Sequence, residues 1–151
     1  IAQSLGGVDP GYQKIFLENA VRFNGEIEKL HQEILGKVRQ FKTREYVTFH
    51  PAWNYFSKRY GLKVIGVIEE APGREPLPRD IVRMVRELKK FKTRIVFAEP
   101  QFNPKIAQAI AKEAGAEVLF LDPLGDPQNP EMNGYIRLMR YNLSQMEKAM
   151  R

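Results

Sequence analysis

The sequence predicts an α/β fold: a four-stranded parallel sheet with helices on both faces, preceded by one long linking helix. After residue 42, short apolar runs rich in β-branched residues alternate with helix-like stretches, which is typical of βαβ units around a buried sheet. Before that point, apolar residues recur every three or four positions, which predicts one long amphipathic helix. The chain has 151 residues, the length of about one domain, and can fold without disulfides or a structural metal.

The long helix is expected to begin at Asp9-Pro10 and to end near Phe41. Asp is a favoured helix cap, and Pro is tolerated at the first helical position. At about 1.5 Å per residue, some 32 residues span roughly 48 Å, well beyond the radius of gyration near 13 Å of a domain of about 100 residues. A missing domain or a partner is therefore expected to cover part of the stripe, which consists of Phe16, Ala20, Phe23, Ile27, Leu30, Ile34, Val38 and Phe41.

Four strands and four helices are expected in the rest of the chain. The predicted strands cover residues 46–49, 64–68, 94–98 and 117–121. The predicted helices cover about 52–60, 78–91, 103–115 and 131–149. We therefore divide the chain into a linking helix, residues 1–41, and an α/β lobe, residues 42–151.

Composition excludes several classes of function. The chain has no cysteine, which excludes disulfide frameworks, cysteine zinc fingers, iron–sulfur clusters and thiol catalysis. No Walker pattern and no GxSxG elbow is present. The formal net charge of +6 admits nucleic acid as a partner, but the densest basic run, residues 79–94, follows an ordinary amphipathic pattern without interleaved aromatics. We interpret this run as a solvated helix face.

An ionisable side chain follows each predicted strand: His50, Glu69 with Glu70, Glu99 and Asp122. Ligands of open parallel sheets bind beyond the carboxyl ends of the strands, so this set is consistent with a metal site or with an acid–base pair. Asp122 could instead cap a turn, and Glu99 could accept hydrogen bonds from nearby amides. His50 is the strongest candidate because His is not a favoured cap. A closed zinc site takes four ligands, or three and water, so any site here is carboxylate-rich or is completed elsewhere.

Three segments resemble, in the same order, motifs of the cluster A-I substrate-binding proteins of zinc and manganese ABC transporters. Residues 50–62 are similar to the segment around the third metal-binding histidine of that family. Residues 96–102 resemble a strand of its zinc-binding members, and residues 121–125 resemble the segment that supplies its carboxylate ligand. The resemblance implies two α/β lobes joined by one rigid helix, with the metal between them. The chain then corresponds to the linking helix and the C-terminal lobe only.

The resemblance implies that His50 is the third metal ligand and Asp122 the fourth, whereas Glu99 receives no ligand role. The family's first two ligands are histidines of the N-terminal lobe, which nothing in this chain matches. Manganese-type members commonly have Glu at the position of His50, and imidazole suits zinc better, so Zn²⁺ is expected in preference to Mn²⁺. The chain departs from the family at Glu75-Pro76-Leu77, where Glu-Pro-Ser is common.

The function implied by the resemblance is metal capture and not catalysis. A periplasmic, or membrane-anchored extracytoplasmic, receptor would bind zinc and deliver it to the membrane permease of an ABC transporter. The implied partners are the N-terminal lobe of the parent protein and the permease, with no nucleic acid, and a dimer of the isolated lobe stays open. Because the ligands must be deprotonated, affinity is expected to fall on acidification through the range in which histidine titrates.

Three alternatives stand beside metal transport. A small α/β hydrolase or lyase would use His50 with Asp122 or Glu99 as an acid–base pair. An adhesin-like protein-interaction domain would have a partner that covers the long helix. A nucleic-acid-binding module would exploit the net positive charge and lose affinity with salt.

Overall fold

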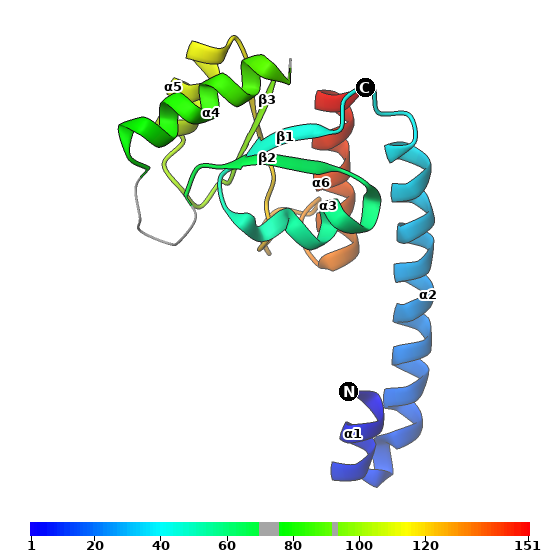
Figure 1. Cartoon of the computed structure of the whole chain (residues 1–151). Helices are drawn as coiled ribbons and strands as arrows, with labels where there is room; N and C mark the ends of the chain where they lie inside the picture. The colour runs from blue at the N-terminus through cyan, green and yellow to red at the C-terminus, as the bar shows by residue number, and fades with distance from the viewer. Residues whose placement is uncertain (70–75, 92–93) are drawn as a thin grey trace. The chain divides into compact units, whose positions relative to one another are not determined.

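The computed structural model describes residues 1–69, 76–91 and 94–151 and divides into two units, Ile1–Gly36 and Lys37–Arg151 (Figure 1). Glu70, Glu75 and Lys92, which the sequence analysis considered, lie outside the described residues. Within the described part of the chain, no helix has both the length and the apolar character needed to cross a membrane.

The first unit is helical and contains one helix that the sequence analysis missed. Helix α1 (Ala2–Val8) is followed by the 3-10 turn η1 (Pro10–Tyr12) and by α2 (Gln13–Val38), which continues into the second unit. A Cβ at Gly6 would lie 2.7 Å from Gln13 Cγ, so any other residue there would have to displace the Gln13 side chain where α1 approaches the start of α2. The glycines of α1 lower helix propensity, and this concealed the helix in the sequence.

The predicted long helix is present, but both of its ends differ from the prediction. Asp9 makes no side-chain capping hydrogen bond, and Pro10 begins a 3-10 turn in place of the helix. Helix α2 ends at Val38, and Phe41 N donates to Val38 O at 3.2 Å in the turn that follows. Phe41 is nevertheless buried, so its place in the apolar pattern reflects burial after the helix has ended.

The second unit contains the predicted four-stranded parallel sheet. Its strands are β1 (Glu45–Thr48), β2 (Lys63–Val67), β3 (Ile95–Ala98) and β4 (Glu117–Phe120), in the order β2-β1-β3-β4. All three strand pairings are parallel. The sheet is buried most deeply at its two central strands, β1 and β3, which matches their continuous apolar sequences.

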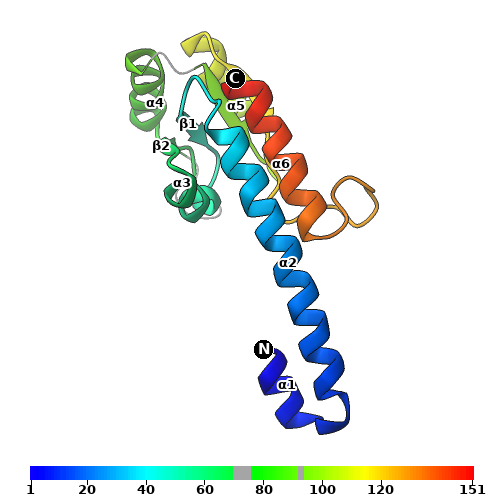
Figure 2. The ribbon, with the colours of Figure 1, turned by 90° about the vertical axis from the view of Figure 1, so that its right-hand side faces the viewer.

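Helices cover both faces of the sheet, as predicted (Figures 1 and 2). One face carries α4 (Pro78–Lys90) and α5 (Lys105–Ala114), whose Met84, Leu88 and Ile110 pack with Val47 and Val96 of the strands. The other carries α3 (Asn54–Tyr60), which follows the 3-10 turn η2 (Pro51–Trp53), and α6 (Tyr135–Met150). The fold therefore leaves the carboxyl ends of all four strands at one edge of the sheet.

A candidate metal site at the carboxyl edge of the sheet

The strand order sets the order of the ionisable side chains along the edge. Glu69 follows β2, His50 follows β1, Glu99 follows β3 and Asp122 follows β4. All four are buried, with exposed fractions of 9%, 8%, 3% and 2% in that order. Burial of a carboxylate is costly unless it is paired, hydrogen-bonded or bound to a cation. The partners of these four side chains therefore have to account for their burial.

The imidazole of His50 lies between two carboxylates, and its ring nitrogens form no hydrogen bond to either. Its Nε2 is 3.9 Å from Glu69 Oε1, and its Nδ1 is 3.7 Å from Glu99 Oε2. Both separations exceed hydrogen-bond length, and neither ring nitrogen has a hydrogen-bond partner among the described residues. Phe102 packs on the imidazole with 4.1 Å between ring centroids and also stacks on Phe49. The ring is thus held by packing, while both of its nitrogens remain available to a ligand.

Glu99 ties His50 to the central strand β3. Its Oε1 accepts a hydrogen bond from the backbone N–H of His50 at 3.2 Å. Burial raises the pKa of Glu99, His50 opposes this shift, and the charge of Asp122 adds to it. Glu99 is therefore a buried carboxyl whose pKa depends on both His50 and Asp122, and it also fixes the backbone of His50.

Asp122 is held by a network of amides. Its Oδ1 accepts hydrogen bonds from Gln101 Nε2 at 2.8 Å, Leu124 N at 2.8 Å and Gly125 N at 3.0 Å. Its backbone N–H donates to Asn142 Oδ1 at 2.8 Å, and Asn142 Nδ2 donates to its backbone carbonyl at 2.7 Å. Asp122 thus caps the turn that follows β4 through its Oδ1, which is the alternative role considered from the sequence. The described residues donate no hydrogen bond to Oδ2, and this oxygen is free to bind a cation.

The structure does not bring His50 and Asp122 into contact. Strand β3 lies between β1 and β4, so the two strand ends are separated by two strand spacings, about 10 Å. Within residues 1–69, 76–91 and 94–151, no group of three or more His, Asp or Glu side chains is arranged to hold a metal ion. The chain offers two candidate ligands at one edge and not a full coordination set.

The amides that position Asp122 were not predicted from the sequence. Gln101 lies in the loop after β3, two residues after Glu99. This position near a predicted strand end was the one indication that its amide could reach the site. Asn142 is a fully buried polar residue among the apolar positions of α6, between Leu138 and Leu143. A polar residue on the apolar face of a predicted helix indicates a buried hydrogen-bond partner, and this signal was present in the sequence.

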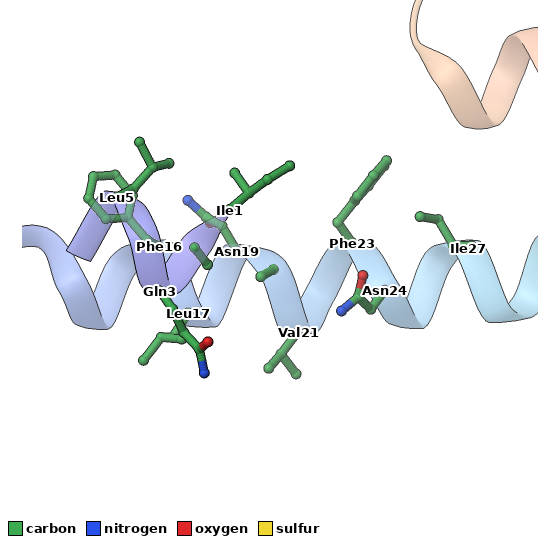
Figure 3. A pocket seen from close by; sticks show the side chains of 12 residues that line it. Ile1, Gln3, Leu5, Phe16, Leu17, Asn19, Val21, Phe23, Asn24 and Ile27 are labelled. Carbon is green, nitrogen blue, oxygen red and sulfur yellow. The ribbon is translucent and has the colours of Figure 1, made fainter. Parts of the chain in front are cut away.

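A second surface feature lies in the first unit. Phe23 and Ile27 of α2 are 44% and 36% exposed, whereas Leu30, Ile34 and Val38 are each 2% exposed. The exposed half of the stripe belongs to an apolar groove of about 850 Å³, and Phe23 and Ile27 point to the same side of α2 (Figure 3). Among the apolar residues that line the groove are Ile1, Leu5, Phe16, Leu17, Val21, Phe23 and Ile27.

A parallel sheet with buried ionisable side chains at its carboxyl edge carries them where open α/β sheets bind their ligands, and this indicates a ligand-binding protein. Residues 1–149 match the family model of the zinc-uptake complex component A, periplasmic (ZnuA), and the chain belongs to this family. This confirms the resemblance stated from the sequence. The family consists of metal-binding transport proteins and not of enzymes, so the prediction that the chain is no enzyme is also confirmed.

Individual relatives agree with this assignment. The high-affinity zinc uptake system protein ZnuA of Brucella abortus is 30% identical over 140 residues, which cover 93% of this chain and 42% of that protein. The laminin-binding protein Lmb of Streptococcus agalactiae superimposes with a TM-score of 0.90 at 34% identity, over 99% of this chain and 57% of that one. The Zn(II)-bound E280Q variant of AdcAII from Streptococcus pneumoniae superimposes with a TM-score of 0.86 at 28% identity, over 99% of this chain and 54% of that one. The chain thus spans about half the length of the proteins it matches, and the predicted fold class is confirmed.

Proposed function

We propose that the chain supplies two ligands, His50 and Asp122, to a zinc site of a periplasmic solute-binding protein that delivers the ion to a membrane permease. The observation that carries this proposal is the buried imidazole of His50, whose two ring nitrogens have no hydrogen-bond partner in the described part of the chain. Buried polar atoms are nearly always paired, and a metal ion satisfies such a nitrogen without a proton donor. Asp122 Oδ2 adds an anionic oxygen whose carboxyl group is already fixed through Oδ1.

The donor types favour zinc over manganese. Zn²⁺ binds imidazole nitrogen and carboxylate oxygen in four-coordinate sites, whereas manganese prefers oxygen ligands. Relatives carry the same indication, since the Brucella abortus protein is named for zinc uptake and the AdcAII variant is described as Zn(II)-bound. Mn²⁺ is the secondary candidate.

The remaining ligands belong, in this proposal, to an N-terminal lobe of the parent protein. Two ligands do not complete a zinc site, and the chain spans only 42% of the Brucella abortus protein. The apolar groove of the first unit is a surface that such a lobe would cover. Residues 1–41 then form the linking helix and residues 42–151 the C-terminal lobe of an extracytoplasmic protein.

A zinc titration followed by the fluorescence of Trp53 tests the site. Trp53 is the single tryptophan of the chain, is buried, and lies three residues after His50. We expect weak zinc binding by the chain, loss of binding in His50→Ala, and a marked decrease in Asp122→Asn. His31→Ala is the matched control, since His31 is the only other histidine of the sequence and belongs to the first unit, whereas the sheet belongs to the second.

Two results would contradict the proposal. Equal zinc affinity of the chain and of His50→Ala would remove His50 from the site. Equal loss in His31→Ala and His50→Ala would point to nonspecific coordination by imidazole. Calorimetry at pH 7.5 and at pH 5.5 provides a second readout, because binding to a deprotonated histidine and carboxylate must weaken on acidification.

Adhesion is a second candidate function, and one observation favours it. The Lmb structure that superimposes with a TM-score of 0.90 is described as a bifunctional protein with adhesin and metal-transporting activity. A solid-phase assay on immobilised laminin tests this candidate. Binding that survives His50→Ala would support an adhesive surface separate from the metal site, and no binding by the chain would exclude it for this part of the protein.

A further inference from the structure

The outer face of α4 carries five cations. Arg79, Arg83, Arg86 and Lys90 are spaced by four, three and four residues, which places them along one side of the helix, and Lys89 lies beside them. All five are exposed. The opposite side of α4 is apolar and buried against the sheet through Met84, Val85 and Leu88. We call these five residues the basic face of α4.

The acidic residues of α4 do not neutralise this face. Asp80 and Glu87 lie on one flank of the helix, where Asp80 pairs with Arg83 at 3.1 Å and Glu87 with Lys90 at 3.9 Å. Lys89 reaches Glu113 of α5 at 3.9 Å, and this carboxylate is itself largely exposed. Arg79 and Arg86 form no ion pair with any described residue. Three carboxylates thus stand against five cations, and the face keeps an excess of positive charge.

The charge of the chain is concentrated in the unit that contains this face. Residues 37–151 hold 21 Lys and Arg against 13 Asp and Glu, whereas residues 1–36 hold 3 against 5. The second unit is thus positively charged and the first is slightly negative. An anionic partner of the chain is attracted to the second unit, and within it α4 is the helix with the densest cations.

We infer that the basic face of α4 docks this protein on a membrane surface of anionic phospholipids. This inference rests on the proposed extracytoplasmic function, in which the protein works beside the membrane that contains its permease. Clusters of four to eight Lys and Arg on an amphipathic helix are typical of binding to anionic lipid headgroups. Because the apolar side of α4 is buried in the protein, the contact is electrostatic, and the helix does not insert into the bilayer.

The features of this face favour lipid over other polyanions. The five cations lie on the convex outside of one helix, with no aromatic side chain between them on which a base could stack. Val82, 57% exposed, is the one apolar side chain among them. Mobile headgroups can rearrange under such a row of charges, whereas a folded protein partner would need matching fixed carboxylates.

Co-sedimentation of the chain with vesicles tests the inference in the absence of zinc. The two vesicle compositions are pure phosphatidylcholine and phosphatidylcholine with 30% phosphatidylglycerol, each in low salt and in 0.5 M NaCl. We expect binding to the anionic vesicles in low salt only, because the Debye length falls from about 10 Å at 0.1 M salt to about 3 Å at 1 M. The variant is Arg79→Gln, Arg83→Gln and Arg86→Gln combined, and its matched control is Lys42→Gln, Lys58→Gln and Lys148→Gln combined, at exposed positions outside α4.

The two variants lose the same net charge, so they separate a local face from overall attraction. At about 1 kcal/mol for each cation, which is about fivefold in affinity, the α4 variant should bind anionic vesicles about 100-fold more weakly, and the control should lose much less. Equal losses in the two variants, binding to pure phosphatidylcholine, or no vesicle binding by the unmodified chain would each overturn the inference. Tighter binding to duplex DNA than to anionic vesicles in the same buffer would overturn the choice of lipid.

The zinc titration of the unmodified chain and of the α4 variant separates this inference from the proposed function. Among the described residues, none of the hydrogen-bond, ion-pair or ring partners of His50 and Asp122 belongs to the basic face, so the α4 variant should bind zinc like the unmodified chain. A chain that binds zinc but no vesicles overturns the membrane inference alone. A chain that binds vesicles but no zinc contradicts the zinc-site proposal and leaves the membrane-binding result in place.

Discussion

At the residue scale, Glu99 is expected to affect both the zinc affinity of the site and the stability of the folded chain. It is buried to 3% exposure, faces His50 Nδ1 at 3.7 Å, and accepts the backbone N–H of His50. A carboxylate beside a metal-binding histidine orients the ring and increases its basicity, and loss of such a partner typically weakens metal affinity by about 10-fold to 100-fold. We therefore expect Glu99→Gln to weaken zinc binding within that range, measured by calorimetry, while Glu113→Gln, at an exposed position of α5, leaves it unchanged.

The same substitution should stabilise the zinc-free chain. Burial raises the pKa of Glu99, so the folded state disfavours its charged form at neutral pH. Because the pKa of Glu99 is higher in the folded chain than in the unfolded chain, its contribution to stability is complete below the unfolded pKa of about 4.5. This contribution is lost as the pH rises through the folded pKa. In urea unfolding, Glu99→Gln should gain stability over the unmodified chain as the pH rises from 4 to 7. A difference that stays constant over this range would contradict a raised pKa of Glu99 in the folded chain.

Tyr46 should make the lobe lose stability at alkaline pH. It is fully buried on β1, and its hydroxyl lies 2.6 Å from Ser57 Oγ of α3. Burial raises the pKa of Tyr46 to about 12, against 10.0 for an exposed tyrosine. The unfolded chain therefore ionises first, and roughly 2 to 3 kcal/mol of stability should be lost as the pH rises from 10 to 12.

The variant Tyr46→Phe isolates this contribution. At neutral pH it leaves Ser57 Oγ without its partner and should be about 1 kcal/mol less stable than the unmodified chain. Above about pH 11 the order should reverse, because phenylalanine cannot ionise. Tyr55→Phe is the control, since Tyr55 is 89% exposed, and its curve of stability against pH should run parallel to that of the unmodified chain.

At the scale of elements, the loop after β4 positions the carboxylate of Asp122. Gly125 donates its N–H to Asp122 Oδ1 and has φ +81°, which side chains disfavour. A Cβ there would lie 3.0 Å from Met132 O and 3.2 Å from Leu138 Cδ2. Alanine at this position must therefore displace the loop as well as bear the strain of its backbone angle.

A second glycine separates these two effects. Gly115 ends α5 with φ +68°, but nothing lies within 4 Å of its Cβ position. Gly115→Ala should cost about 1 to 2 kcal/mol of stability from the backbone angle alone. Gly125→Ala should cost more and should also weaken zinc binding, as thermal unfolding and a zinc titration will show. Equal costs, with zinc affinity unchanged in both variants, would contradict the role of this loop in fixing Asp122.

The elements were predictable from sequence where one periodic pattern dominates. All four strands lie within one residue of the predicted bounds because continuous β-branched runs flanked by turn residues leave little choice. Helix α1 was not predictable, since its two glycines oppose helix formation, and the close approach of Gly6 to Gln13 exists only in the folded chain. Asp9 was wrongly assigned as a helix cap because Pro10 begins a 3-10 turn in which the Asp9 side chain makes no hydrogen bond.

The position of the candidate residues at the ends of the strands was predictable, and their geometry was not. Strand ends can be read from the sequence, and so His50, Glu99 and Asp122 could be named together. The strand order, which places Glu99 between the other two, requires the crossovers to be known. The burial of the His50 nitrogens depends on Phe102, from a different loop, and no local pattern indicates this contact.

At the scale of the whole molecule, the apolar groove of the first unit leaves the chain with an adhesive surface. Phe23 and Ile27 expose over a third of their side chains in a groove of about 850 Å³. Contiguous exposed apolar surface of this kind marks an interface, and in the proposed parent protein the N-terminal lobe covers it. Without that lobe, two copies of this chain can cover each other's grooves. This would give the dimer that the sequence left as a possibility.

We expect the chain to self-associate with rising concentration and the double variant Phe23→Ser and Ile27→Ser to do so at least about tenfold more weakly. Each substitution removes about 1 kcal/mol or more of apolar burial from the interface. Sedimentation velocity over a concentration series measures the effect. The matched control is Tyr55→Ser with Val82→Ser, two exposed residues of the second unit, which should associate like the unmodified chain. A chain that stays monomeric throughout, or an equal loss in the control, would show that the groove does not drive association.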